Sequence, residues 1–146
     1  MNERISLSKN SIVIDTGVFI EYFEKTEAGI KFKKKLLMDP DIIHYHLSPL
    51  VETELKYLFC RKWGKQKGFL LVEELLMNYS IHSESDLRDE ASRLKCNYSI
   101  SLADCYSLAI ATLNTFPIYF KKEAEILENL KSLSKEAELY IFLFIN

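Results

Sequence analysis

The stretch Ser11–Ile20, with the sequence SIVIDTGVFI, decides the fold, because an apolar run ends there at a single carboxylate, Asp15. The β-branched residues 12–14 are typical of a short buried strand. A helix is expected to begin at about Phe19, so Asp15 stands at the carboxyl end of the first predicted strand. Ligands bind beyond this end of the strands in open parallel sheets, and Asp also commonly caps a following helix. Both roles are therefore open for Asp15.

The same alternation of apolar strand and helix continues along the chain. Further strands are expected at 42–47, 80–82, 117–120 and 139–145. Helices are expected at 19–23, 27–38 and 49–63, and another follows Gly64 and Gly68 and ends at about residue 77. Further helices are expected at 85–96, at 101–114 and before the last strand. Ser48 and Pro49 have the N-cap and first-turn pattern of a helix start, while Gly64 and Gly68 are expected to interrupt helical structure. This pattern predicts the α/β class, with a mostly parallel sheet covered by helices on both faces.

Composition narrows the class of protein. A chain of 146 residues with 48% apolar residues is expected to form a single domain spanning residues 1–146. Three cysteines without a C-x-x-C pair suit a reducing, cytoplasmic setting, and no secretory signal is recognised at the N-terminus. The longest apolar runs, such as 141–145, are too short to cross a bilayer, so no membrane partner is expected. The net charge of −2 gives no overall attraction to nucleic acid.

Four acidic residues from distant parts of the chain are candidates for one site. Asp15 and Glu123 each follow a predicted strand, and Glu54 and Asp104 lie early on predicted helices. Each also has an ordinary structural explanation. Glu54 borders an apolar helical stripe, Asp104 completes a capping box with Ser101, and Glu123 favours a helix N-terminus.

The combination of these acids is harder to explain structurally. Two carboxylates about 4 Å apart repel by roughly 4 kcal/mol at an effective dielectric constant of about 20, so a cluster needs protons or cations. Carboxylate oxygens suit Mg²⁺ or Mn²⁺, and no cluster of His and Cys competes for another metal. The sequence therefore predicts a magnesium or manganese site made by Asp15, Glu54, Asp104 and Glu123.

Three short motifs carry a resemblance to a known family. They are Ile12-Val13-Ile14-Asp15-Thr16, Thr53-Glu54-Leu55, and Ser101-Leu102-Ala103-Asp104 followed by the segment 108–112. Their order and spacing over residues 10–130 resemble the PIN-domain family, and more narrowly the VapC-type ribonuclease toxins of toxin–antitoxin pairs. The resemblance implies a three-layer α/β/α fold with a central, mostly parallel sheet.

The resemblance also implies an activity and partners. It implies endonucleolytic hydrolysis of RNA that depends on Mg²⁺ or Mn²⁺, with Asp15, Glu54 and Asp104 at the family's acidic positions. Thr16 matches the hydroxyl residue that follows the first Asp. The family commonly dimerises and binds a small antitoxin protein, so an antitoxin, a homodimer and an RNA substrate are expected.

The chain departs from the family pattern at two places. Gly17 stands where a second hydroxyl residue is common. The Thr-x-Asp motif after the fourth strand is replaced by Phe120-Lys121-Lys122-Glu123, in which Glu123 is the candidate fourth acid and Glu125 a rival. Lys121 and Lys122 lie near the predicted pocket and are candidates for phosphate binding. The altered motif leaves one metal or two open.

Other functions remain to be weighed against the ribonuclease. A phosphatase of the haloacid-dehalogenase type needs a second Asp two residues after the first, where this chain has Gly17. The altered motif favours a different alternative, a PIN-like module that binds partners without catalysis. A PIN nuclease of RNA processing is a further alternative to a toxin.

Overall fold

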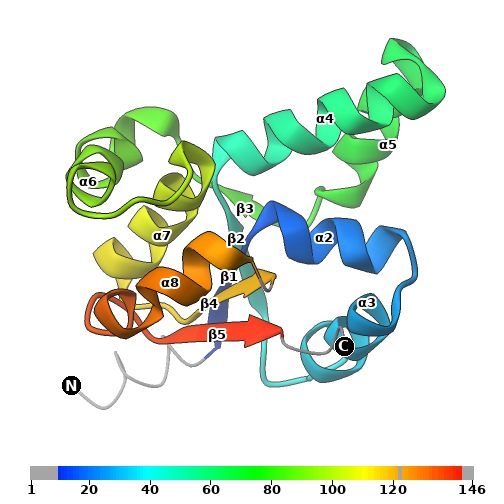
Figure 1. Cartoon of the computed structure of the whole chain (residues 1–146). Coiled ribbons are helices and arrows are strands. Elements are labelled where there is room, and N and C mark those ends of the chain that lie inside the picture. Colours follow the sequence, from blue (N-terminus) through cyan, green and yellow to red (C-terminus); the bar gives the residue numbers. More distant parts are fainter. Residues whose placement is uncertain (1–9, 122, 143–146) are drawn as a thin grey trace.

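The computed structural model describes residues 10–121 and 123–142 of the chain, and residues 139–142 by their backbone alone. The strands and helices alternate as the sequence predicts (Figure 1). In chain order they are β1 (Ser11–Ile14), α2 (Thr16–Phe23), α3 (Glu27–Phe32), the π-helical turn η1 (Lys33–Leu37), β2 (His44–Leu47), α4 (Pro49–Trp63), α5 (Lys65–Leu75), β3 (Ser80–Ile81), α6 (Glu84–Asn97), α7 (Leu102–Asn114), β4 (Ile118–Lys121), α8 (Ala124–Leu133) and β5 (Leu139–Phe142).

The strands form one sheet in the order β3-β2-β1-β4-β5, and every pair of neighbours is parallel. Strand β1 is central, since Val13 pairs with His46 of β2 on one side and with Ile118 of β4 on the other. All strands therefore end at the same edge of the sheet. The α/β class with a parallel sheet is confirmed.

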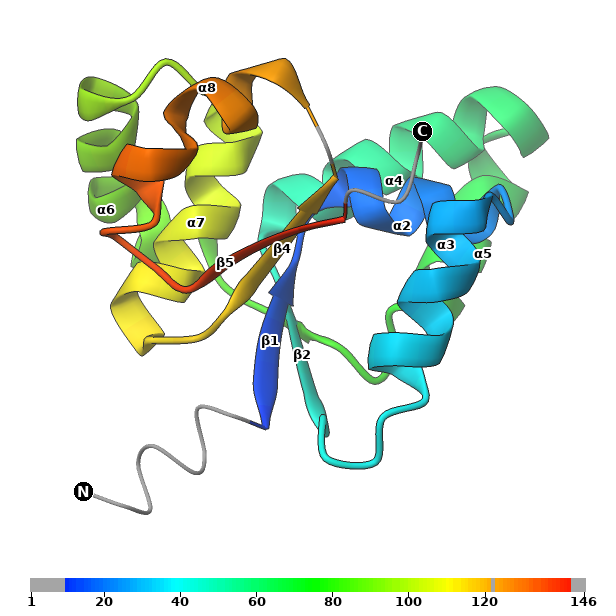
Figure 2. The same cartoon turned by 60° about the horizontal axis from the view of Figure 1, so that its bottom comes forward.

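Alternation of side chains along β1 separates two hydrophobic cores. Val13 faces a core shared with α6, α7 and α8, whereas Ile12 and Ile14 face a core shared with the helices from α2 to α5. Figure 2 shows these two groups of helices on opposite sides of the strands. Because successive side chains of a strand point to opposite faces, three apolar residues in a row bury both faces at once. The expected three-layer arrangement is confirmed.

Two predicted helix boundaries differ from the structure. Helix α2 begins at Thr16 rather than at Phe19, because Asp15 has an extended backbone and acts as its N-cap. The predicted helix over 27–38 is divided, since the α-helical turns of α3 widen into η1 after Phe32.

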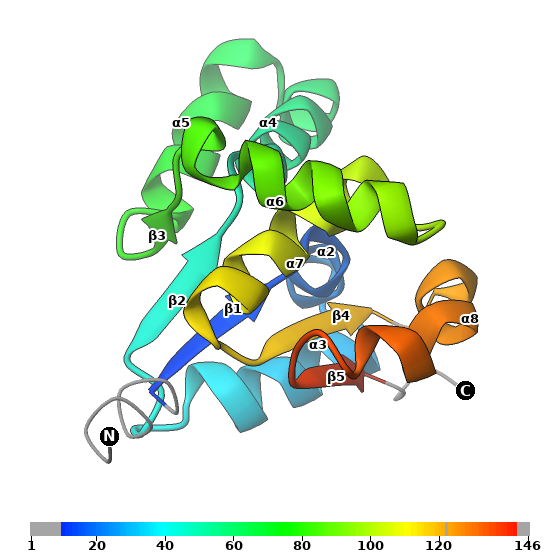
Figure 3. The same cartoon turned by 90° about the vertical axis from the view of Figure 1, so that its left-hand side faces the viewer.

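The expected break at Gly68 is wrong. Gly64 alone ends α4, with a φ of 87°, and Gly68 lies inside α5. A Cβ at Gly68 would lie 2.6 Å from the carbonyl carbon of Phe59, so this glycine lets α4 and α5 approach closely. The two helices form the paired projection that Figure 3 shows beyond β2 and β3. No helix in the described ranges combines the length and apolar character that a membrane span needs.

Candidate active site

A cavity of about 210 Å³ opens at the edge where β1 and β4 end. Its walls include the five residues predicted to form the site: Asp15, Thr16, Glu54, Asp104 and Glu123. They come from the segment after β1, from α4, from α7 and from the segment before α8. The fold therefore brings the predicted acids together, as parallel strands and their following helices allow.

Asp15 and Thr16 begin α2 at the floor of the cavity, and both are buried. The backbone amide of Gly17 donates to Asp15 Oδ2 over 3.4 Å, so Asp15 has the capping role as well as its place in the cavity. The hydroxyl of Thr16 donates a hydrogen bond of 3.0 Å to Glu54 Oε1. This bond fixes Glu54, which lies on α4, toward the start of α2.

Asp104 enters the cavity from the first turn of α7. The hydroxyl of Ser101 caps this helix by accepting a 3.1 Å hydrogen bond from the backbone amide of Asp104. Asp104 is 4% exposed, and its Oδ2 atom has no hydrogen-bond partner within the described part of the chain. A buried oxygen without a partner is costly, so this atom indicates that the cavity accepts a ligand.

Glu123 completes the acidic set from the rim. It occupies the N-cap position of α8 with an extended backbone, and it is more exposed than the other acids. Glu125, the rival for the fourth acid, lies in the first turn of α8 and does not line the cavity. Lys122 is outside the residues that the structure describes.

The acids of the cavity disfavour one another's charged forms. Burial, together with the charges of Asp104 and Glu123, raises the pKa of Asp15 well above its usual value of 3.8. Burial raises the pKa of Asp104 to about 6, an effect that hydrogen bonding with the Ser101 hydroxyl and the Asp15 carboxyl limits and the Glu123 charge increases. The pKa of Glu123 is also raised, mainly by burial and against the influence of Lys121. Such raised values mark a site that holds more negative charge than the protein alone neutralises.

A divalent cation fits this set of side chains. The oxygens are carboxylates, the hard ligands that Mg²⁺ and Mn²⁺ prefer, and Asp104 Oδ2 lacks another partner among the described residues. No three His, Cys, Asp or Glu side chains within residues 10–121 and 123–142 already stand in the arrangement of a complete metal site. The cavity therefore supplies the ligand chemistry, and water or substrate oxygens would complete the coordination, as is usual for Mg²⁺.

Sequence reasoning missed several residues at or beside this site, among them the cavity residues Ile20 and Ala103. Ser101 and Gly17 line the cavity, although their types suggest only a cap and a turn. Glu21 does not line the cavity, but it is 8% exposed and forms an ion pair with the cavity residue Lys121. The sequence signal that points to Glu21 is a single acidic residue inside the apolar run 18–23.

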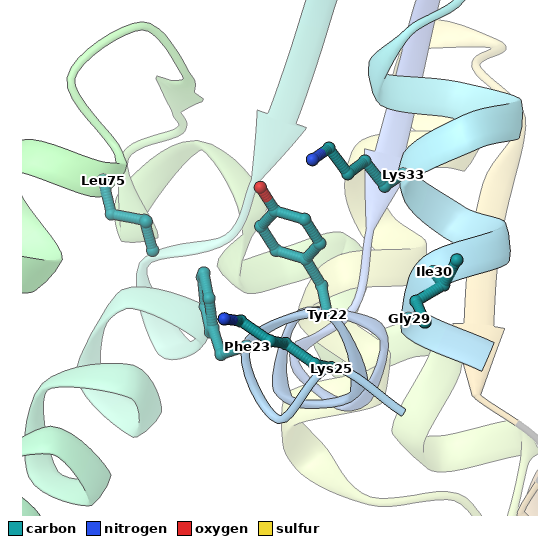
Figure 4. Close-up of a pocket in the computed structure, with 7 residues that line it drawn as sticks. All are labelled: Tyr22, Phe23, Lys25, Gly29, Ile30, Lys33 and Leu75. Carbon is teal, nitrogen blue, oxygen red and sulfur yellow. The ribbon is translucent and has the colours of Figure 1, made fainter. Parts of the chain in front are cut away.

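A second cavity of about 370 Å³ lies at the other end of α2 (Figure 4). Tyr22 and Phe23 of α2 form its aromatic part, and Ile30 of α3 and Leu75 of α5 add aliphatic surface. The chain also places two lysines there, Lys25 and Lys33. This cavity, called the apolar groove below, contains no carboxylate among its described lining residues.

Comparisons with known proteins agree with the fold. The family model described as PIN domain matches residues 12–134. No curated protein sequence is significantly similar to the chain.

Solved structures of toxins share the arrangement of helices and strands. A toxin–antitoxin complex from Klebsiella pneumoniae has a TM-score of 0.63 at 18% identity, covering 79% of this chain and 89% of that one. The sarcin–ricin loop cleaving toxin VapC20 of Mycobacterium tuberculosis has a TM-score of 0.63 at 15% identity, covering 88% and 98%. VapBC-1 of nontypeable Haemophilus influenzae has a TM-score of 0.64 at 12% identity, covering 90% and 98%. At these identities the likeness concerns the fold.

Proposed function

Because this chain belongs to the PIN-domain family, we propose that it is a divalent-metal-dependent endoribonuclease and the toxin of a toxin–antitoxin pair. The observation that carries the proposal is the pairing of Asp15 and Asp104 in one cavity. Both residues are 4% exposed, both carboxyl groups have raised pKa values, and Asp104 has an oxygen without a partner in the described residues. Holding them buried without a cation is unfavourable, and a cation site at this edge of the sheet suits a hydrolase.

Some side chains of the cavity would hold the metal ion, and Thr16 orients one of these side chains. Asp15 and Asp104 would hold Mg²⁺ or Mn²⁺ directly, and Glu54 and Glu123 would do so directly or through water. Thr16 keeps Glu54 in place through its hydrogen bond of 3.0 Å. When bound, such an ion supplies positive charge for the scissile phosphate and lowers the pKa of water.

Glu123 favours the nuclease over the module that binds without catalysis. That alternative depends on the altered motif after β4, in which the expected fourth acid is displaced. Glu123 nevertheless lines the cavity and raises the pKa of Asp15 by its charge. The altered motif therefore still provides a fourth carboxylate at the site.

An RNA cleavage assay tests the proposal. The wild-type chain is expected to cleave RNA with Mg²⁺ or Mn²⁺ and to be inactive with EDTA. Asp15→Asn and Asp104→Asn should each abolish cleavage while circular dichroism shows a folded protein. Asp89→Asn, on the exposed face of α6, is the matched control and should cleave normally. Normal cleavage by both cavity variants would contradict the assignment, and retained partner binding without any cleavage would favour the binding module.

The apolar groove supports the proposal of an antitoxin partner. Ile30 at its edge is 48% exposed, and the two lysines at the groove favour a partner segment with apolar side chains flanked by acidic ones. We propose that an antitoxin segment of this kind binds there and that the toxin forms a homodimer. A short reading frame beside the gene, co-expressed and co-purified with the chain, tests the first proposal. Light scattering of the purified chain tests the second.

A further inference from the structure

Lys121 is the last residue of β4, and its side chain reaches the rim of the acidic cavity. Its Nζ atom lies 2.9 Å from Glu21 Oε1, and its side chain is 35% exposed, compared with 11% for that of Glu21. The hydroxyl of Thr26 donates to the other carboxylate oxygen of Glu21. The lysine is therefore held by a carboxylate that is itself buried and anchored.

The charges of this pair are stable near neutral pH. Burial would raise the pKa of Glu21, but its hydrogen bonds with Thr26 and Lys121 outweigh burial and lower it. The hydrogen bond with Glu21 in turn raises the pKa of Lys121. The ion pair with Glu21 holds the ammonium group of Lys121 at the rim.

Gly17 makes room for the lysine stem. A Cβ added at Gly17 would lie 2.9 Å from Lys121 Cβ and 3.3 Å from its Cδ. The same atom would lie 3.4 Å from Glu123 Oε1. The stem of Lys121 therefore crosses the surface that a side chain at position 17 would otherwise fill.

The cavity needs such a cation if it is to meet a nucleic acid. Four carboxylates line it, and Lys121 is the one basic side chain among its described lining residues. An approaching phosphate is repelled by these carboxylates, and the net charge of −2 gives no overall attraction to offset this repulsion. Lysine binds phosphate as a compact point charge, which suits a contact at an open rim.

We infer that Lys121 binds a backbone phosphate of the RNA substrate at the mouth of the cavity, with Glu21 and Gly17 acting as positioning residues. The inference rests on the proposed ribonuclease function. It gives the altered motif after β4 a role in substrate binding. This role is separate from the absence of the threonine that the family pattern has in this motif.

Steady-state cleavage of a single-stranded oligoribonucleotide, with Mn²⁺ fixed and KCl varied, tests this inference. Lys121→Met is expected to raise KM about tenfold, the loss of one charge-assisted contact, and to change kcat less than about twofold. The slope of log KM against log salt should fall by about 0.7, the value for one phosphate contact on a single strand. Lys121→Arg should keep the wild-type slope. Lys34→Met removes an exposed lysine of η1 outside the cavity and should leave KM and slope unchanged.

A second variant separates phosphate binding from support of the fold. Glu21→Gln breaks the ion pair but keeps the ammonium group, so it should lower Tm and retain the salt slope. Equal losses of Tm in Glu21→Gln and Lys121→Met, with the wild-type slope in both, would overturn the inference and leave the ribonuclease intact. A wild-type chain that cleaves no RNA with any divalent ion would overturn the proposed function and this inference together.

Discussion

The two ends of helix α2 carry opposite kinds of surface. At its N-terminus the cavity is lined by four carboxylates, whereas at its C-terminus the apolar groove is lined by aromatic and aliphatic side chains with two lysines. The helix spans eight residues, so about 12 Å separates the two ends. One short helix therefore contributes its N-cap Asp15 and its first residue Thr16 to one cavity, and Tyr22 and Phe23 to the other.

The difference shows how each surface is adapted to a different ligand. Buried carboxylates with raised pKa values oppose folding until a cation or a proton arrives, so the acidic cavity is suited to an ion. Exposed apolar side chains carry no charge that opposes folding, and their burial against another protein is favourable. Changes at one end of α2 should therefore affect cleavage, and changes at the other should affect partner binding.

The largest difference between the effect on partner binding and the effect on cleavage is expected from Ile30→Glu. A buried charge in the apolar groove should weaken antitoxin binding about a hundredfold, near 3 kcal/mol, as hot-spot changes do. Leu113→Glu is the control, since Leu113 is 53% exposed on α7 and does not line the groove. Calorimetric titration with the antitoxin measures both. Cleavage by Ile30→Glu without antitoxin should equal that of the wild type, and a matching loss of cleavage would break the separation.

Gly29→Ala should damage the groove by a different route. A Cβ at Gly29 would lie 2.0 Å from the carbonyl oxygen of Glu21, so α3 would have to move away from α2. Overpacking of this kind costs about 2 kcal/mol, which a thermal or urea unfolding curve measures.

Gly64→Ala provides the contrast for Gly29→Ala. A Cβ at Gly64 has no described atom within 4 Å, but its φ of 87° is unfavourable for alanine, so the expected cost is about 1 kcal/mol. Equal stability of the two variants would mean that the contact between α2 and α3 does not limit the fold.

The acidic cavity should make the free energy of unfolding depend on pH. The folded-state pKa of Asp104 is about 6 against an ordinary value of 3.8, so the folded protein retains this proton between those pH values. The stability linked to the proton is present below pH 3.8 and is lost as the pH rises through about 6.

Comparison with Asp104→Asn isolates this effect. In EDTA the variant should have a higher Tm than the wild type at pH 7, and the difference should vanish below about pH 4, where both side chains are neutral. Saturating Mn²⁺ should reverse the order by stabilising the wild type alone. A constant difference in Tm across the pH range would contradict the raised pKa.

Thr16→Val should have the smallest effect. It removes the hydrogen bond to Glu54 but leaves the shape of the side chain, so kcat should fall about fivefold, corresponding to about 1 kcal/mol. Thr16→Ser retains the hydroxyl and should keep most of the activity. A wild-type kcat in Thr16→Val would show that the position of Glu54 does not depend on this bond.

The sequence predicts the sheet and the convergence of acids because both depend on local patterns. Residues 12–14 are apolar on both faces of β1, and Asp15 must then emerge at the carboxyl edge. The Ser101 cap fixes where α7 begins and therefore where Asp104 points. Because the strands are parallel, the positions that these local patterns determine lie at a single edge of the sheet.

The remaining features depend on packing between segments far apart in the chain. The place of Gly68 inside α5 follows from its approach to Phe59, and no pattern around Gly68 shows this contact. The crossing of Lys121 over Gly17 and its pairing with Glu21 likewise join two elements far apart in the chain, β4 and α2. The apolar groove arises only once α2, α3 and α5 are side by side.

The most direct test of the account is the anomalous scattering of crystals soaked with Mn²⁺. We expect a peak bounded by the carboxylates of Asp15 and Asp104, with the previously unpartnered Oδ2 of Asp104 as one of its ligands, and no peak in crystals of Asp104→Asn. A peak elsewhere on the molecule, or an empty cavity at a Mn²⁺ concentration that supports cleavage, would contradict the account.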